Sequence, residues 1–134
     1  MPWDLGLAGH SDGDAICHAV ADALLGAAGL GDIGQHFPSH DPQWKDASSI
    51  GLLAGLGTLL EQAGFVVHNI DVTVVMEVPR LDAYREAMIT SLAEALALAP
   101  VQVGLKAKTN DGLGPVGGGE AIAAMAVALV EKRV

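Results

Sequence analysis

The spacing of apolar residues divides the chain into helical and strand-like stretches. Segments rich in Ala and Leu are typical of helices, which we predict over residues 12–28, 49–64, 81–97 and 120–132. Gly29 can close the first helix, and either Ser48 or Ser49 can cap the second. Residues 33–45 contain two prolines and little periodicity, so we predict a loop there.

Two further stretches have the pattern of β-strands. Residues 65–76 hold a run of Val and Ile that is typical of a largely buried strand, and residues 101–108 alternate as a half-buried strand does. Two strands form only a marginal ribbon, whereas four helices need a sheet face to cover. We therefore expect the missing strands to come from another subunit or from an N-terminal piece that this chain lacks.

Composition excludes several classes of protein. The 134 residues have the size of one domain, and a hydrophobic content of 51% excludes intrinsic disorder. A net charge of -9 argues against nucleic-acid binding, which needs a basic face. No stretch is long and apolar enough to cross a membrane. Because Cys17 is the single cysteine, no internal disulfide can form, and a reducing cytoplasm is the expected location.

Three polar residues of the first predicted helix share one face. Asp14, His18 and Asp22 follow one another at intervals of four residues, among small or apolar neighbours. A neutral imidazole with carboxylates suits Zn or Mn, and either Asp could orient the ring nitrogen that the metal leaves free. His10, just before the predicted helix, can approach the same cleft. A charged helix face with an N-terminal Asp cap is the alternative interpretation, and the spacing alone does not separate the two.

A glycine-rich stretch precedes the last predicted helix. Gly112, Gly114 and Gly117 match the G-x-G-x-x-G pattern, but a dinucleotide-binding unit needs another parallel strand after the helix, and none is predicted before the chain ends. The stretch could still offer backbone N–H groups to a phosphate, with Lys106 and Lys108 adding positive charge. A tight turn before a core helix is an equal alternative.

The other histidines and the cysteine carry less information. His36 and His40 flank a Phe-Pro pair and are expected to be exposed, and His68 interrupts a strand as a surface or edge residue. Cys17 and His18 are neighbours on a helix, so their side chains point about 100° apart and do not form a thiolate–imidazole pair. We predict that Cys17 is a core thiol.

The motifs, taken in order, resemble one known family over essentially the whole chain. They are His-Ser-Asp-Gly-Asp at residues 10–14, His18, Gly-Asp-Ile-Gly at residues 31–34, Phe37-Pro38, Asp41-Pro42, Asp71-Val-Thr-Val, Lys106-Ala-x-Thr109 and Leu-Gly-x-x-Gly-x-Gly-Glu120. This order and spacing resembles the 2-C-methyl-D-erythritol 2,4-cyclodiphosphate synthase family of non-mevalonate isoprenoid synthesis.

The resemblance implies a fold and a reaction. The fold would be α/β (α+β), a ferredoxin-like subunit with a small mixed sheet covered by helices on one face, assembled as a homotrimer with active sites between subunits. The reaction would be that of a phosphorus–oxygen lyase, which cyclises 4-diphosphocytidyl-2-C-methyl-D-erythritol 2-phosphate and releases CMP. Zinc, and Mg or Mn on the substrate diphosphate, would be the cofactors, and neither nucleic acid nor membrane would be a partner.

The resemblance also assigns roles to residues of this chain. His10 and Thr109 would be catalytic, His18 would bind zinc, and Asp111 would hold a magnesium ion. Substrate contacts would come from five groups of residues: His10 and Ser11; Asp32, Ile33 and Gly34; Phe37, Pro38, Ser39, His40 and Asp41; Met76, Pro79, Arg80 and Leu81; Lys108, Thr109, Asn110 and Asp111.

The sequence departs from the family pattern in two ways. Family members begin with a strand carrying Asp-x-His, which completes the zinc site, and no such motif precedes His10 here. We expect residues 1–134 to form a single domain without this strand, with Asp4, His10 or Asp14 as substitute ligands. Other residue types than usual stand at Ser39, Lys108, Pro115 and Gly118. The alternative function is therefore an impaired or truncated homologue that keeps the trimer and the cytidine-nucleotide pocket.

Overall fold

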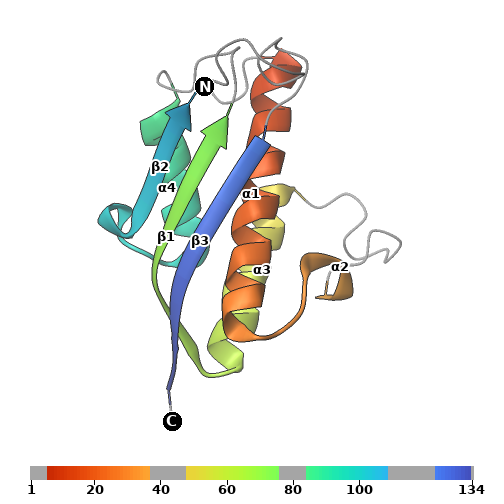
Figure 1. Cartoon of the computed structure of the whole chain (residues 1–134), viewed down its shortest axis with the longest axis vertical. Helices are drawn as coiled ribbons and strands as arrows, with labels where there is room; N and C mark the ends of the chain where they lie inside the picture. The colour runs from red at the N-terminus through yellow and green to blue at the C-terminus, as the bar shows by residue number, and fades with distance from the viewer. Residues whose placement is uncertain (1–5, 37–47, 76–83, 109–122, 134) are drawn as a thin grey trace.

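The described part of the chain folds into a three-stranded sheet with helices on one side (Figure 1). The computed structural model describes residues 6–36, 48–75, 84–108 and 123–133, and in the first helix it describes side chains from Gly13 onward. The elements in chain order are α1 (Gly6–Ala28), α2 (Ile33–His36), α3 (Ser49–Gln62), β1 (Phe65–Val75), α4 (Arg85–Leu96), the 3-10 turn η3 (Pro100–Gln102), β2 (Val103–Lys108) and β3 (Ala123–Lys132).

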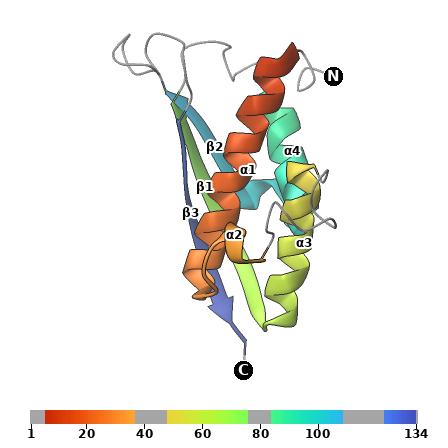
Figure 2. The same cartoon turned by 90° about the vertical axis from the view of Figure 1, so that its right-hand side faces the viewer.

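The sheet is mixed, with strand order β2-β1-β3. The central strand β1 runs parallel to β2 and antiparallel to β3, and a bulge between Val67 and Asn69 shifts its register to β3. Figure 2 shows the sheet almost edge-on, with α1, α3 and α4 all on the same side. The expected small mixed sheet covered by helices on one face is therefore confirmed.

The core lies between the sheet and the three long helices. Its fully buried side chains include Ile16, Val20, Leu24 and Leu25 of α1, Leu53, Leu56 and Leu60 of α3, Met88 and Leu92 of α4, and Ile70, Val72 and Val74 of β1. The α3 residues recur at helical spacing, and the β1 residues alternate along the strand. Asp71, between two of the buried β1 residues, is exposed, so β1 is half-buried rather than largely buried. One helix layer can cover only one face of the sheet.

The helix ends follow the predicted signals, with one exception. Gly29 has a positive φ of 71°, and the N–H of Leu30 donates to the carbonyl of Leu25 at 2.9 Å, as expected where a glycine ends a helix. Ser48 caps α3, because its Oγ accepts a hydrogen bond from the Gly51 N–H at 3.0 Å. The exception is α1, which begins at Gly6 and therefore contains His10. No proline or β-branched residue between Gly6 and His10 stops the helix from extending.

The last described segment is a strand, so the helix predicted over residues 120–132 is wrong. Alternate residues of β3 pack against the core, and the residues between them are exposed, which is the period of a strand. Alanine favours helices, but β1 offers a full edge of backbone hydrogen-bonding groups that β3 satisfies, and tertiary context overrides weak propensity. One of the strands expected from elsewhere is thus part of this chain.

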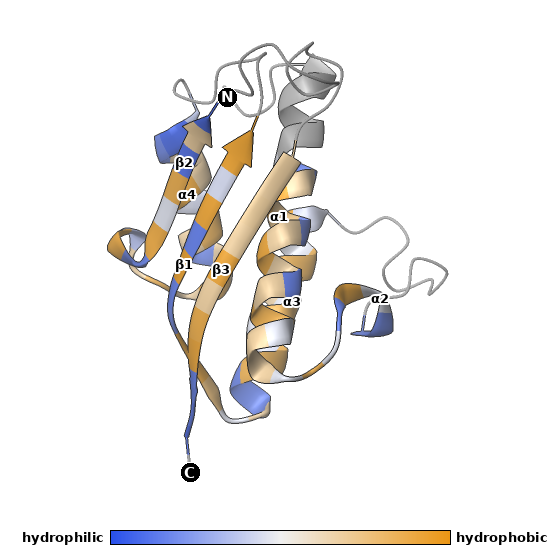
Figure 3. Ribbon diagram, viewed as in Figure 1, coloured by the Kyte–Doolittle hydropathy of each residue, from blue (hydrophilic) through white to orange (hydrophobic). Residues whose placement is uncertain are grey.

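The helix-free face of the sheet carries apolar side chains on β3. Met125, Val127 and Leu129, here called the β3 row, are 57%, 72% and 60% exposed. Figure 3 shows β3 as apolar down to the polar residues at its end. Large exposed apolar side chains that are contiguous on a surface mark an interaction site. Among the described residues, no helix is long and apolar enough to cross a membrane.

Candidate active site

The polar stripe predicted on α1 is present, and its three members have different surroundings. Asp14, His18 and Asp22 lie on successive turns of α1, with His18 and Asp22 exposed and Asp14 half-buried. Each of the two carboxylates accepts a hydrogen bond from another element. His18 therefore stands between two carboxylates that are already engaged.

Asp14 connects α1 to the start of α3. Its Oδ1 accepts a hydrogen bond of 2.5 Å from the hydroxyl of Ser49, the first residue of α3. The neighbouring Cys17 is buried in the core, as predicted. Burial, reinforced by the negative charge of Asp14, raises the pKa of Cys17 to about 12, so its thiol stays protonated and unreactive.

Asp22 connects α1 to the turn that leads into α2. Its Oδ1 accepts from the backbone N–H of Ile33 at 3.0 Å. Asp32 and Gln35 brace the same turn, since the Gln35 N–H donates to Asp32 Oδ1 at 3.1 Å and the Asp32 N–H donates to Gln35 Oε1 at 3.2 Å. The predicted substrate residues Asp32, Ile33 and Gly34 are thereby held in one defined turn beside α1.

His36 belongs to this turn as well, so the expectation that it is exposed is wrong. Its side chain is half-buried, and Nε2 lies 2.6 Å from the carbonyl oxygen of Leu30. Residues 33–36 form the short helix α2, so the loop predicted from residue 33 onward is wrong for these residues. The second histidine of that prediction, His40, lies outside the described residues.

The described residues do not by themselves form a metal site. No group of three His, Cys, Asp or Glu side chains among them is arranged to hold an ion. A catalytic zinc site uses three protein ligands and keeps one open position. Of the residues that the structure describes, His18 alone fills a position that the resemblance assigns to zinc, so these residues do not fit a complete zinc centre.

Both lysines of β2 are exposed. Lys106 pairs with Asp71 across the exposed face of the sheet, and Gly104 leaves room for that carboxylate, because a Cβ there would lie 2.7 Å from Asp71 Oδ1. Lys108 ends β2 and is exposed. Since the glycine-rich stretch is followed by a strand and not a helix, the proposed phosphate site at a helix N-terminus is wrong.

The surface histidine behaves as predicted. His68 is exposed, and its Nε2 lies 2.8 Å from Glu131 of the neighbouring β3. Many of the other predicted site residues lie outside the described part of the chain: Phe37, Pro38, Ser39, Asp41, Met76, Pro79, Arg80, Leu81, Thr109, Asn110 and Asp111. His10 and Ser11 lie in α1 by their backbone. Sequence reasoning missed Ser49 as the partner of Asp14, although its place at a predicted helix start was recognised.

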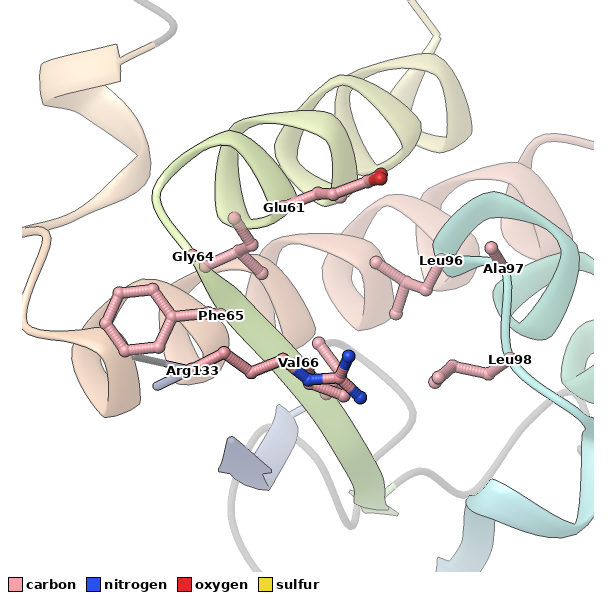
Figure 4. A pocket seen from close by; sticks show the side chains of 11 residues that line it. Glu61, Gly64, Phe65, Val66, Leu96, Ala97, Leu98 and Arg133 are labelled. Atoms are coloured by element: carbon pink, nitrogen blue, oxygen red, sulfur yellow. The ribbon is translucent and has the colours of Figure 1, made fainter. Parts of the chain in front are cut away.

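A pocket at the C-terminal ends of α3 and α4 contains none of the predicted site residues. Apolar side chains such as Leu60, Leu96 and Leu98 line it, together with Glu61 and Arg133 (Figure 4). It lies where β1 begins and β3 ends, far along the strands from Lys108. The pocket is therefore separate from the α1 stripe.

The structure so far defines a class: an α+β fold whose helices cover one face of the sheet. Its strand β3 exposes apolar side chains on the other face, and its helix α1 carries a histidine between two carboxylates that are hydrogen-bonded to other segments. The YgbB family matches residues 1–131. The chain therefore belongs to the YgbB family, and the resemblance found in the sequence is confirmed.

Two similar proteins have the same name. The 2-C-methyl-D-erythritol 2,4-cyclodiphosphate synthase of Desulfosudis oleivorans is 52% identical over 130 residues, which are 97% of this chain and 77% of that protein. The synthase of Laribacter hongkongensis is also 52% identical, over 134 residues that are 100% of this chain and 83% of that protein.

Solved structures of similar proteins share the fold. The bifunctional IspDF of Campylobacter jejuni has a TM-score of 0.84 and 37% identity over 92% of this chain and 34% of that chain, so the match spans about a third of that larger protein. A CDP-bound 2C-methyl-D-erythritol-2,4-cyclodiphosphate synthase has a TM-score of 0.80 and 38% identity over 91% of this chain and 79% of that chain. A CDP complex from Plasmodium falciparum has a TM-score of 0.78 and 31% identity over 93% of this chain and 75% of that chain.

Proposed function

We propose that this chain is a 2-C-methyl-D-erythritol 2,4-cyclodiphosphate synthase, which cyclises 4-diphosphocytidyl-2-C-methyl-D-erythritol 2-phosphate and releases CMP. The observation that carries the proposal is the identity of about half to proteins of that name over nearly the whole chain. The similarity to CDP-bound structures supports a cytidine nucleotide as the ligand, and the same findings do not favour a homologue without activity.

The chemistry suits the residues assigned to it. A phosphate oxygen attacks the diphosphate, and the bond to CMP breaks, so the reaction needs in-line positioning and neutralisation of charge more than proton transfer. The turn with Asp32, Ile33 and Gly34 would hold the methylerythritol part, and His10 with Ser11 would contact phosphate. Lys108 would place a positive charge at the start of the diphosphate-binding stretch, in which Thr109 would support the transition state.

We propose a divalent metal cofactor, with zinc bound weakly at His18 and Mg or Mn on the substrate diphosphate near Asp111. A divalent ion would offset negative charge that a chain of net charge -9 does not neutralise with its own cations. Because the described residues do not complete a zinc centre, we assign no step of the reaction to the metal. Plasma mass spectrometry of the purified protein should find zinc below one ion per chain, and His18→Ala should lower it further.

We also propose that the subunit assembles as a homotrimer with active sites between subunits. The bare sheet face with its β3 row is the surface that such an assembly would bury. Residues 1–134 would form one domain of this assembly. A buried, free Cys17 is compatible with a reducing cytoplasm, where we place the protein.

Turnover of the authentic substrate tests the proposed function. Chromatography should detect CMP, and phosphorus NMR should detect the cyclic diphosphate, in equal amounts. Calorimetry should show CDP binding more tightly than ADP. His10→Ala should abolish turnover, whereas His68→Ala, which changes an exposed histidine paired with Glu131, should keep it. If the protein binds CDP but forms neither product, it is the impaired homologue; if it binds CDP and ADP equally, the cytidine assignment is wrong.

A further inference from the structure

The two carboxylates that flank His18 connect α1 to two different segments of the chain. Asp14 lies one turn before His18 and accepts from Ser49 at the first turn of α3. Asp22 lies one turn after His18 and accepts from Ile33 at the start of α2. Figure 1 shows α2 and the beginning of α3 on the same side of α1. The stripe is thus a pair of attachment points with His18 between them.

The spacing makes these two contacts independent. Eight residues of α-helix separate Asp14 from Asp22, a rise of about 12 Å, so one contact cannot substitute for the other. Asp14 is half-buried and bonded to a side chain, whereas Asp22 is exposed and bonded to a backbone amide. Each carboxylate uses Oδ1 for a partner outside α1, so each has a structural contact that does not involve His18.

We propose that Asp14 and Asp22 are positioning residues of the active site, which hold the start of α3 and the Asp32–Gly34 turn on either side of His18. This inference rests on the proposed function, because it needs the turn to contact substrate. Asp22 acts through the Ile33 amide, and therefore sets where the turn lies relative to α1. Asp14 acts through the Ser49 hydroxyl, and sets where α3 begins. This role requires neither metal binding nor proton transfer by Asp14 or Asp22.

A conservative substitution can show whether a carboxylate is needed as a hydrogen-bond acceptor or for its negative charge. Asparagine keeps a carbonyl oxygen at the position of the carboxylate oxygen and can accept the same hydrogen bond, whereas alanine cannot. Asp22→Asn should therefore retain the contact to Ile33, and Asp22→Ala should lose it. A metal ligand or a charged partner of His18 would be impaired by both changes.

The first measurement follows the contact itself. Amide hydrogen exchange by NMR should show the Ile33 N–H protected in the wild type and in Asp22→Asn, and exchanging faster in Asp22→Ala. Glu61→Ala removes an exposed carboxylate on another helix and should leave that amide unchanged. An Ile33 amide that exchanges equally fast in the wild type and in Asp22→Ala would overturn the proposed contact.

The second measurement follows the reaction. Asp22→Ala should raise KM on the order of ten-fold with little change in kcat, because a displaced turn weakens binding of the substrate part that it contacts, and Asp22→Asn should restore KM. Asp14→Ala and Ser49→Ala should each raise KM in the same way. Because the two residues form one contact, the variant that carries both changes should have a KM no higher than that of either single variant. Loss of kcat in both Asp22→Asn and Asp22→Ala would show that the charge is needed and overturn the positioning role.

Different results would contradict the proposed function and the positioning role of Asp14 and Asp22. If the wild type forms no cyclic product, the proposed function is wrong, whatever the variants do. If the wild type is active and its Ile33 amide is protected, but Asp22→Ala has wild-type KM and kcat, only the positioning role is wrong.

Discussion

Replacing Val127 by lysine should dissociate the assembly without unfolding the subunit. Full burial of a Val, Leu or Met side chain contributes about 1.5–3 kcal/mol. Since Met125, Val127 and Leu129 remain 57%, 72% and 60% exposed in the single chain, assembly can still bury more than half of each. This corresponds to roughly 1–2 kcal/mol for each side chain and roughly 3–6 kcal/mol for the β3 row of each subunit.

The lysine removes the contribution of Val127 and adds a charge that would have to leave water. Burying an unpaired charge costs several kcal/mol, so association should weaken by a factor of about 100 or more. Light scattering coupled to gel filtration should show a trimer for the wild type and a monomer for Val127→Lys. The melting curve of the dissociated subunit, followed by circular dichroism, should stay cooperative, because Val127 lies outside the core.

A matched control lies on the same molecule. Val101 is 91% exposed but belongs to η3, outside the β3 row, so Val101→Lys should leave the assembly intact. A wild type that is monomeric, or a Val127→Lys variant that elutes as a trimer, would refute the assignment of the β3 row to the interface. Dissociation of both variants would show that the interface is not confined to that row.

Three further results are expected. Ala128→Leu should lower the free energy of unfolding by about 1–3 kcal/mol in urea titrations, because Ala128 packs against the core and a larger side chain there would overpack it; a neutral effect would contradict that packing. Ser48→Ala should cost about 1 kcal/mol by removing the acceptor for the Gly51 N–H, while Ser48→Asp should cost little. The unfolded chain releases the Cys17 proton near pH 9 and the folded chain only near pH 12, so stability should fall over that interval by up to about 1.4 kcal/mol per pH unit; Cys17→Ala should lack this part of the slope.

Local patterns in the sequence predicted most of the individual elements. The helix spacing of Leu53, Leu56 and Leu60, the cap at Ser48 and the end at Gly29 all act within one turn of the chain, so they can be read from neighbouring residues. The burial of Cys17 was predicted because a free cysteine is among the residues most often buried. The motifs around His18 are specific enough to indicate the family from the order and spacing of residues alone.

The nature of β3 was decided by tertiary structure. Ala124, Ala126 and Ala128 favour a helix when each is considered alone, and the alternation with Val127 and Leu129 is visible only once one side of the segment is known to be covered. The open edge of β1 needs backbone partners, and α1 needs small side chains beneath it. Both requirements come from residues more than 40 positions away, since Val75 pairs with Ala123.

The same distinction holds for the candidate site. The sequence placed Asp14, His18 and Asp22 on one helix face, because helical periodicity is a local property. It could not show what the carboxylates bind, since Ser49 is 35 residues from Asp14 and Ile33 is 11 residues from Asp22. The packing of α2 and α3 against α1 brings Ile33 and Ser49 within hydrogen-bonding distance of the two carboxylates. A hydrogen bond depends on the distance between two groups in space, and the sequence gives only their separation along the chain.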